Sequence, residues 1–142
     1  MRELTEAAKT AKAIRAELKE AFPSIKFSVR SKNFAGGDSV RIDWTNGPPD
    51  KAVEKITNKY EYGHFNGMID LYEYSNVRND IPQAKYVFAG RTITDEVRAA
   101  KKAEIAEKFG VEDPENEDHW WKIFSRWSNE VVYKELRDLI LN

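Results

Sequence analysis

Two short segments of alternating apolar and polar residues constrain this chain more than any other feature of its sequence. In residues 25–30, and again in 39–45, apolar side chains alternate with polar or charged ones. A period of two is typical of a β-strand with one buried face. The polar segment 31–38, which contains Gly36 and Gly37, predicts a turn that joins the two strands into a hairpin. We expect one face of this hairpin to pack on a helix and the other to be wet and basic.

Helical periodicity on both sides of the hairpin predicts what covers it. Residues 4–21 carry apolar side chains at helical spacing, and Pro23 ends that helix. Further patterns predict a helix over 50–60, a loop over 63–68, strands over 68–74 and 85–90, a helix from Thr94 to Phe109, and a final helix or pair of helices over 118–141. The fold class is therefore α+β, in the order α-β-β-α-β-β-α-α. We expect a four-stranded, mainly antiparallel sheet with helices packed on one face and a helical C-terminal tail.

Length and composition indicate a single domain. The chain has 142 residues, of which 41% are hydrophobic and 33% charged, as in ordinary globular proteins. We expect one domain over 1–142, with an αββαββ core at 1–92 and a helical extension at 93–142. The absence of cysteine excludes disulfides, thiolate-bound metals and thiol catalysis. No signal peptide and no membrane-spanning run is visible, so we expect a cytoplasmic protein without a membrane partner.

Residues that could carry catalysis are few. His64 with Asp70 six residues on could form a base and its orienting partner, but no nucleophile accompanies them at a working spacing. His119 lies at a helix start in an acidic setting and is more typical of a structural or exposed residue. The carboxylates that could bind a catalytic metal do not fall into a nuclease pattern; they are Asp43, Glu54, Asp70 and Glu73. The sequence therefore predicts no enzyme, no metal and no cofactor.

Two groups of residues could instead bind a partner. Cations on the first helix and on the wet face of the hairpin could neutralise several phosphates; they are Lys12, Arg15, Lys19, Lys26, Arg30, Lys32 and Arg41. Aromatic residues that could stack on bases are Phe34, Tyr72, Tyr74, Tyr86 and Phe88, although core packing would explain such alternation too. The second group gathers in the tail and consists of Trp120, Trp121, Phe124 and Trp127. Because neighbouring helical residues differ by about 100°, one side of this group can enter the core while the other offers interface anchors.

One stretch of the sequence resembles a known family. Residues 22–31 read FPSIKFSVRS, residues 44–48 read WTNGP, and Phe65-Asn66-Gly67-Met68 and Asp70 follow. Over about residues 8–92 the chain is similar to a large polyvalent protein-associated domain, a type found in multi-domain proteins of phages and conjugative elements. The resemblance implies an α+β fold, no catalytic residues, and a role in countering host defence.

These observations lead to three hypotheses of function. The leading one is a non-enzymatic phage or mobile-element protein that binds a host protein complex, such as a CRISPR effector or another defence nuclease, and so acts as a defence-system inhibitor of the anti-CRISPR kind. The alternative is a nucleic-acid-binding module that uses the basic first helix and hairpin. A third class is a hydrolase centred on His64 and Asp70. The target and the oligomeric state are open.

Overall fold

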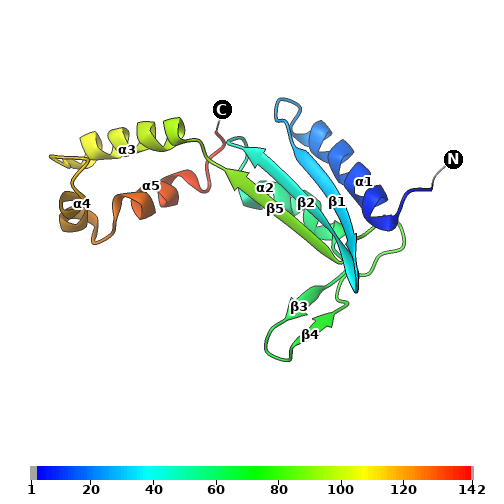
Figure 1. Cartoon of the computed structure of the whole chain (residues 1–142). Coiled ribbons are helices and arrows are strands. Elements are labelled where there is room, and N and C mark those ends of the chain that lie inside the picture. The colour runs from blue at the N-terminus through cyan, green and yellow to red at the C-terminus, as the bar shows by residue number, and fades with distance from the viewer. Residues whose placement is uncertain (1–2, 142) are drawn as a thin grey trace.

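The structure is a computed structural model that describes residues 3–141 (Figure 1). Its elements are α1 (Glu6–Ala21), β1 (Ser28–Phe34), β2 (Gly37–Thr45), α2 (Asp50–Thr57), the 3-10 helix η1 (Asn58–Tyr60), β3 (His64–Asn66), β4 (Leu71–Glu73), β5 (Tyr86–Thr92), α3 (Asp95–Phe109), α4 (Glu117–Phe124) and α5 (Ser128–Leu136). Figure 1 shows three parts. The sheet domain contains α1, β1, β2, α2, η1 and β5; the arm is the β3–β4 hairpin with its flanks, residues 62–74; and the tail is residues 93–141 with α3 to α5.

The main sheet has three strands in the order β1-β2-β5, in which β1 and β2 are antiparallel and β2 and β5 are parallel. The expected α+β class is confirmed, but the single four-stranded, mainly antiparallel sheet is not observed. The chain leaves β2, passes through α2 and returns beside β2 in the same direction, which is the crossover that a parallel pair requires. Because a hairpin would give an antiparallel pair, this long connection decides the direction of β5.

The predicted third strand belongs to the arm instead of the main sheet. Only residues 71–73 of the expected 68–74 form a strand, and they pair with residues 64–66, which the sequence predicted to be a loop. The rings of Tyr72 and Tyr74 lie 5.3 Å apart, and both contact the ring of Tyr62. The alternation in this segment therefore reflects ring packing within the arm, where a core strand was expected.

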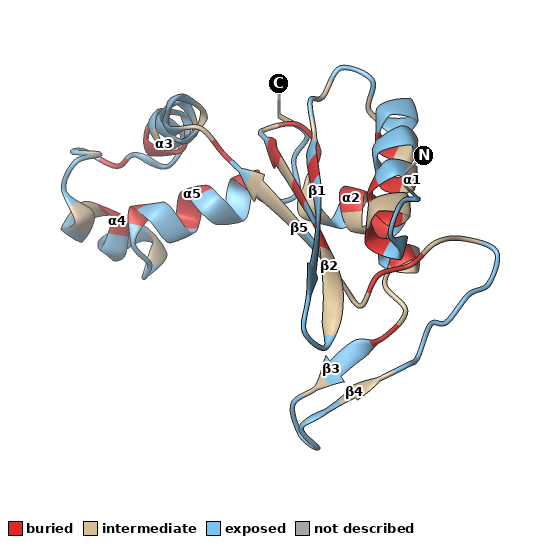
Figure 2. Ribbon diagram, turned by 45° about the vertical axis from the view of Figure 1, so that its right-hand side comes forward, coloured by how far each residue is buried: buried red, intermediate tan, exposed pale blue. Residues whose placement is uncertain are grey.

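The core of the sheet domain lies between β2 and the helices. Val40, Ile42 and Trp44 on β2 are almost completely buried, and they pack against Ile14 and Leu18 of α1. Figure 2 shows buried segments on β2 and α1. Each such side chain contributes roughly 1.5–3 kcal/mol when it is fully buried. The hairpin predicted between 25 and 45 is confirmed, but its first strand covers 28–34 instead of 25–30. Most of the predicted loop 31–38 is strand, and the turn is limited to residues 35–36.

The tail has a hydrophobic core of its own. Trp120 is completely buried at its centre, with residues of α3 and α5 around it. The backbone of Gly110 (φ 72°) ends α3 in the left-handed conformation that glycine adopts at little cost. Ser125 (φ 54°) divides the C-terminal segment into α4 and α5, which is the helix pair that the sequence left open.

Arg91 at the end of β5 joins the tail to the sheet domain. Its guanidinium donates hydrogen bonds to the carbonyls of Asn46 and Gly47 (each 3.0 Å) and to the carbonyl of Leu139 (2.7 Å). The amide of Leu141 donates to the Gly47 carbonyl at 2.7 Å, which adds a second tie at the same place. The cation thus satisfies carbonyls that follow the end of α5, where the helix dipole is negative.

Glu17 connects α1 to the segment that follows α2. Its carboxylate accepts hydrogen bonds of 2.6 Å from both the Lys59 ammonium and the Tyr60 hydroxyl. Burial raises the pKa of Glu17, but the two hydrogen bonds and the charge of Lys59 outweigh burial and leave the pKa below its ordinary value. The folded state therefore favours the ionised carboxylate.

Replacement of Arg91 by Met should loosen the tail. The change keeps the aliphatic stem and removes the donors, so we expect the free energy of unfolding in urea to fall by about 1.5–3 kcal/mol. Hydrogen exchange of the Leu141 amide should also accelerate, because its bond to Gly47 lies in the same joint. Arg126→Met, at an exposed position in the tail, is the control and should change neither quantity. Unchanged exchange in Arg91→Met would show that the joint does not depend on this cation.

Replacement of Glu17 by Gln should remove a pH-dependent part of the stability. Because the folded-state pKa is lowered, the ionised carboxylate stabilises the protein above the ordinary value of 4.5, and this gain is lost as the pH falls through the folded-state pKa. We expect Glu17→Gln to be less stable than the parent at pH 7 and the difference to shrink below pH 4.5. Urea unfolding at a series of pH values measures this, with the exposed Glu20→Gln as control. A difference that stays constant with pH would contradict the assignment.

Candidate functional site

One face of the main sheet stays uncovered by the helices of the described chain. α1 and α2 pack on the face formed by Val40, Ile42 and Trp44, and the tail continues beyond the end of β5 (Figures 1 and 2). We call the opposite side the open face. The strand registers place five rows of residues across it: Phe34 with Gly37; Lys32 with Ser39 and Tyr86; Arg30 with Arg41 and Phe88; Ser28 with Asp43 and Gly90; and Thr45 with Thr92.

Aromatic rings stack along the open face. The rings of Tyr86 and Phe88 are nearly parallel, at 6°, with centroids 6.0 Å apart, and Phe34 stacks on Tyr86 at 6.3 Å and 22°. Phe34 reaches across β2 because Gly37 beneath it has no side chain; a β-carbon there would lie 3.4 Å from the Phe34 ring and 2.7 Å from the stem of Lys85. Phe34 is 42% exposed and Phe88 50%, so both present ring surface to solvent.

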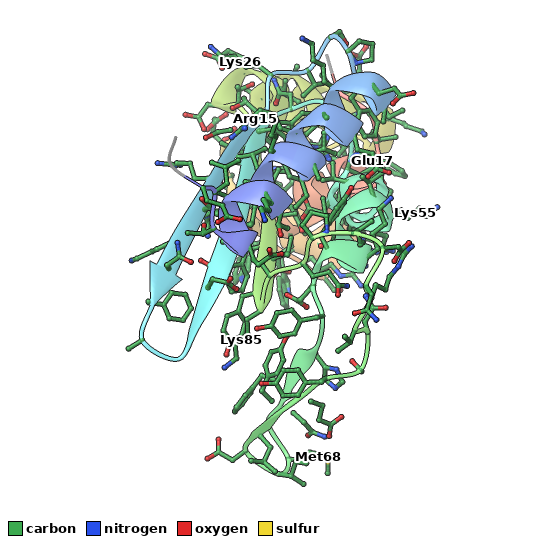
Figure 3. All side chains as sticks on the ribbon, turned by 90° about the vertical axis from the view of Figure 1, so that its right-hand side faces the viewer. Arg15, Glu17, Lys26, Lys55, Met68 and Lys85 are labelled. Carbon is green, nitrogen blue, oxygen red and sulfur yellow. The ribbon has the colours of Figure 1, made fainter. Side chains whose placement is uncertain are left out.

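The ring stack continues into the arm. Tyr72 meets Tyr86 edge to face at 5.6 Å, and its hydroxyl donates a hydrogen bond of 2.5 Å to the Lys85 carbonyl. Burial, followed by the nearby Glu61 carboxylate, raises the pKa of Tyr72, so the hydroxyl remains a donor. The Lys85 ammonium lies 5.0 Å from the Tyr72 centroid and 5.7 Å from that of Tyr86, at the junction visible in Figure 3. A cation therefore stands over the rings where the arm leaves the sheet.

Cations and one carboxylate accompany the rings. Arg30 and Arg41 face each other across β1 and β2 in the row that ends with Phe88, and their side chains are 75% and 61% exposed. The Asp43 Oδ2 atom accepts from Arg41 Nε at 3.2 Å and lies 3.9 Å from Arg30 Nη2. Asp43 is the only carboxylate in the five rows of the open face, so positive charge dominates there.

The seven cations predicted to bind nucleic acid are divided among several places. Arg30, Lys32 and Arg41 lie on the open face. Lys12 and Arg15 of α1 line a groove of about 530 Å³ beside Arg30, and Arg15 also donates to the Val29 carbonyl at 2.7 Å. Lys26 borders a cavity at the opposite end of the sheet from Lys85 (Figure 3), and Lys19 is exposed in the last turn of α1. The open face and the adjoining groove thus bring together five of the seven.

Two thirds of the chain matches a known protein family. A model of the family described as large polyvalent protein associated domain 29 fits residues 5–99. The chain belongs to this family. It is accordingly a phage- or mobile-element-associated protein, and the resemblance seen over 8–92 is confirmed and extends into α3. No curated protein and no solved structure matches the chain.

Most of the tail lies beyond the residues that match the family. Its four predicted partner-binding residues fall into a pair that packs in the core of the tail and an exposed pair. Trp120 lies in the core with its Nε1 atom donating to the Pro114 carbonyl at 2.9 Å, and Phe124 stacks on it, half-buried. Trp121 and Trp127 point outward, 47% and 46% exposed, with centroids 4.8 Å apart. Of these four residues, Trp121 and Trp127 are the two that present aromatic surface to solvent.

His64 has other partners than the Asp70 expected from the sequence. Its Nδ1 atom lies 2.9 Å from the Ser75 hydroxyl, and its Nε2 atom lies 3.3 Å from a Glu73 oxygen, on an exposed strand of the arm. Asp70 sits in the arm's turn with a left-handed backbone (φ 53°). Within residues 3–141, no three His, Asp or Glu side chains gather where they could share a metal ion.

A cavity of about 760 Å³ lies at the far end of the open face. Its wall includes Ser28, Asp43, Thr45 and Thr92 of the open face, and Lys26 lies at its border.

Among the described helices, none has the length and apolar character needed to cross a bilayer. Gly90, next to Asp43, is a site residue that the sequence did not single out, because only the β2–β5 register places it there.

Proposed function

We propose that the open face of the sheet domain binds single-stranded nucleic acid. The observation that carries the proposal is the ring stack of Phe34, Tyr86 and Phe88 beside Arg30 and Arg41 on a face without a covering helix. Unpaired bases stack on exposed aromatic rings, and cations next to those rings neutralise the phosphates between the bases. A paired duplex hides its base faces, so the rings favour a single strand.

The charges of the open face support the same ligand. Arg30, Lys32, Arg41 and Lys85 surround the ring stack, against the single carboxylate of Asp43. The groove lined by Lys12 and Arg15 adjoins Arg30 and extends the positive surface around the edge of β1. An interface for an apolar protein partner would not need four cations around one carboxylate, whereas binding of a phosphate backbone does.

Neutralisation of two cations should weaken binding and reduce its dependence on salt. In the double variant Arg30→Gln/Arg41→Gln we expect the affinity for a fluorescent ten-nucleotide single strand to fall, because two phosphate contacts are lost. The slope of log affinity against log salt should become shallower by about 1.4, at about 0.7 per contact for single strands. Phe88→Ala should weaken binding by roughly 5- to 150-fold through loss of one stacked base. Fluorescence anisotropy at several salt concentrations measures both effects.

The matched control for this prediction removes the same charge elsewhere. Lys51→Gln/Lys55→Gln changes two exposed residues of α2, on the helix-covered side of the sheet (Figure 3). We expect its salt slope to equal that of the parent. No binding by the parent at low salt, or equal slopes in both double variants, would refute nucleic-acid binding at the open face.

A second candidate function belongs to the tail. The exposed pair Trp121 and Trp127 supports binding of a host protein complex, because paired tryptophans are favoured anchors of protein interfaces. In a phage- or mobile-element-associated protein, such a complex would be a defence system such as a CRISPR effector, which the chain would inhibit as an anti-CRISPR does.

Removal of the two tryptophans should abolish this second function. We expect Trp121→Ala/Trp127→Ala to bind a purified CRISPR effector at least about thirtyfold more weakly than the parent, and to lose any rescue of phage plating on a host with active immunity. Interferometry and plaque counts measure these outcomes, and Phe88→Ala on the open face is the control that should retain both. Absence of effector binding and of plating rescue by the parent would exclude the anti-CRISPR role.

A further inference from the structure

The ring stack ends at Phe88, next to a glycine on the same face of β5. Because Tyr86 and Phe88 have nearly parallel rings and lie two residues apart on one strand, the side of the Phe88 ring away from Tyr86 is the side of residue 90. Residue 90 is glycine, so no side chain covers that ring face from β5. The next position of β5 therefore offers bare backbone, bordered by side chains of β2.

Two polar groups of β2 border the space above Gly90. A β-carbon at Gly90 would lie 3.3 Å from Asp43 Oδ1 and 3.6 Å from Arg41 Nη2. The other carboxylate oxygen, Oδ2, accepts from Arg41 Nε, whereas Oδ1 has no hydrogen-bond donor among the described residues. Asp43 thus turns one occupied oxygen toward the arginines and one free oxygen toward the space above Gly90.

We propose that this space, which we call the Gly90 slot, binds a base that carries an exocyclic amino group. The inference rests on the proposed single-strand binding and adds a base preference to it. The base would stack on the second face of Phe88 and donate from its amino group to Asp43 Oδ1. The Asp43 carboxylate can only accept, and adenine, cytosine and guanine all present amino donors at the ring edge.

Uracil and thymine fit the slot poorly for an electrostatic reason. Their ring N–H lies between two carbonyl oxygens, which the Asp43 carboxylate repels. The neighbouring Arg41 Nη2 atom adds a donor that suits the ring nitrogen next to the amino group of cytosine or adenine. Beyond the slot, the 760 Å³ cavity begins at Asp43 and gives the chain of the nucleic acid room to continue toward Lys26.

Two ligands that differ only at this contact test the inference. Oligo-deoxycytidine and oligo-deoxyuridine of ten nucleotides have the same backbone and ring size. They differ at position 4, which carries an amino or a carbonyl group, and at the adjacent N3, which accepts in cytosine and donates in uracil. We expect the parent protein to bind the cytidine oligomer at least about fivefold more tightly, as one good base-edge contact provides. Anisotropy at one fixed salt concentration measures the ratio.

Two variants, Asp43→Asn and Gly90→Val, test whether the affinity ratio of the two oligomers depends on the slot, and Asp70→Asn is their control. Asp43→Asn, whose amide can donate to a carbonyl as well as accept, should bring the ratio close to one. Asp70→Asn removes the same charge in the arm's turn, where asparagine tolerates the left-handed backbone, and should keep the ratio of the parent. Gly90→Val fills the slot with a residue suited to a strand, and should weaken binding of both oligomers and remove their difference.

The outcomes separate the slot from the open face as a whole. Equal binding of both oligomers by the parent, or a preference that persists in Asp43→Asn, overturns the slot and leaves the open face as a single-strand site. Failure of the parent to bind either oligomer overturns the proposed function and the slot with it. Thermal unfolding of each variant tests whether it is folded. If Gly90→Val does not fold, the comparison of Asp43→Asn with its control Asp70→Asn decides whether the slot sets the base preference.

Discussion

The alternation of β2 determines how the rest of the sheet domain is arranged. β2 is the central strand, and the burial of Val40, Ile42 and Trp44 against the helices fixes which of its faces is the core. A slip of one residue would expose all three side chains, and at roughly 1.5–3 kcal/mol for each the register is strongly specified. The same alternation turns Arg41 and Asp43 outward. The open face is therefore a direct consequence of the core on the other side of one strand.

Much of this arrangement is predictable from the sequence because its signals are local. The hairpin and its basic face follow from period-two patterns, the limits of α3 follow from Thr94 and Gly110, and the two-sidedness of the tryptophan cluster follows from the angle between neighbouring helical residues. The direction of β5 is not local, since it depends on the crossover through α2. The prediction for the arm was wrong because Tyr72 and Tyr74 alternate in order to pack on each other, and not on the core of the main sheet. The arm is also held close by Gly63, since a side chain at that position would collide with the Glu73 carbonyl.

The candidate site shows the same limit. The cations and rings of the open face were visible as residue types, but the sequence grouped Arg30 and Arg41 with Lys19 and Lys26, which the structure places elsewhere. Asp43 appeared only as an ordinary surface carboxylate. Its relation to Phe88 and Gly90 arises from the parallel register of β2 and β5, which sets Arg41 opposite Phe88 and Asp43 opposite Gly90. No pattern within either strand alone encodes that pairing.

The limits of the family match bear on how the two candidate functions relate. Residues 5–99 include the whole open face and only the start of α3, whereas Trp121 and Trp127 lie beyond them in a tail with its own core. The two parts meet in a small polar joint around Arg91, and their hydrophobic clusters are separate. A tail that packs independently can change its outer surface without disturbing the sheet. Single-strand binding would accordingly be a property of the family domain, and recognition of a host complex a property that this chain's tail adds to it.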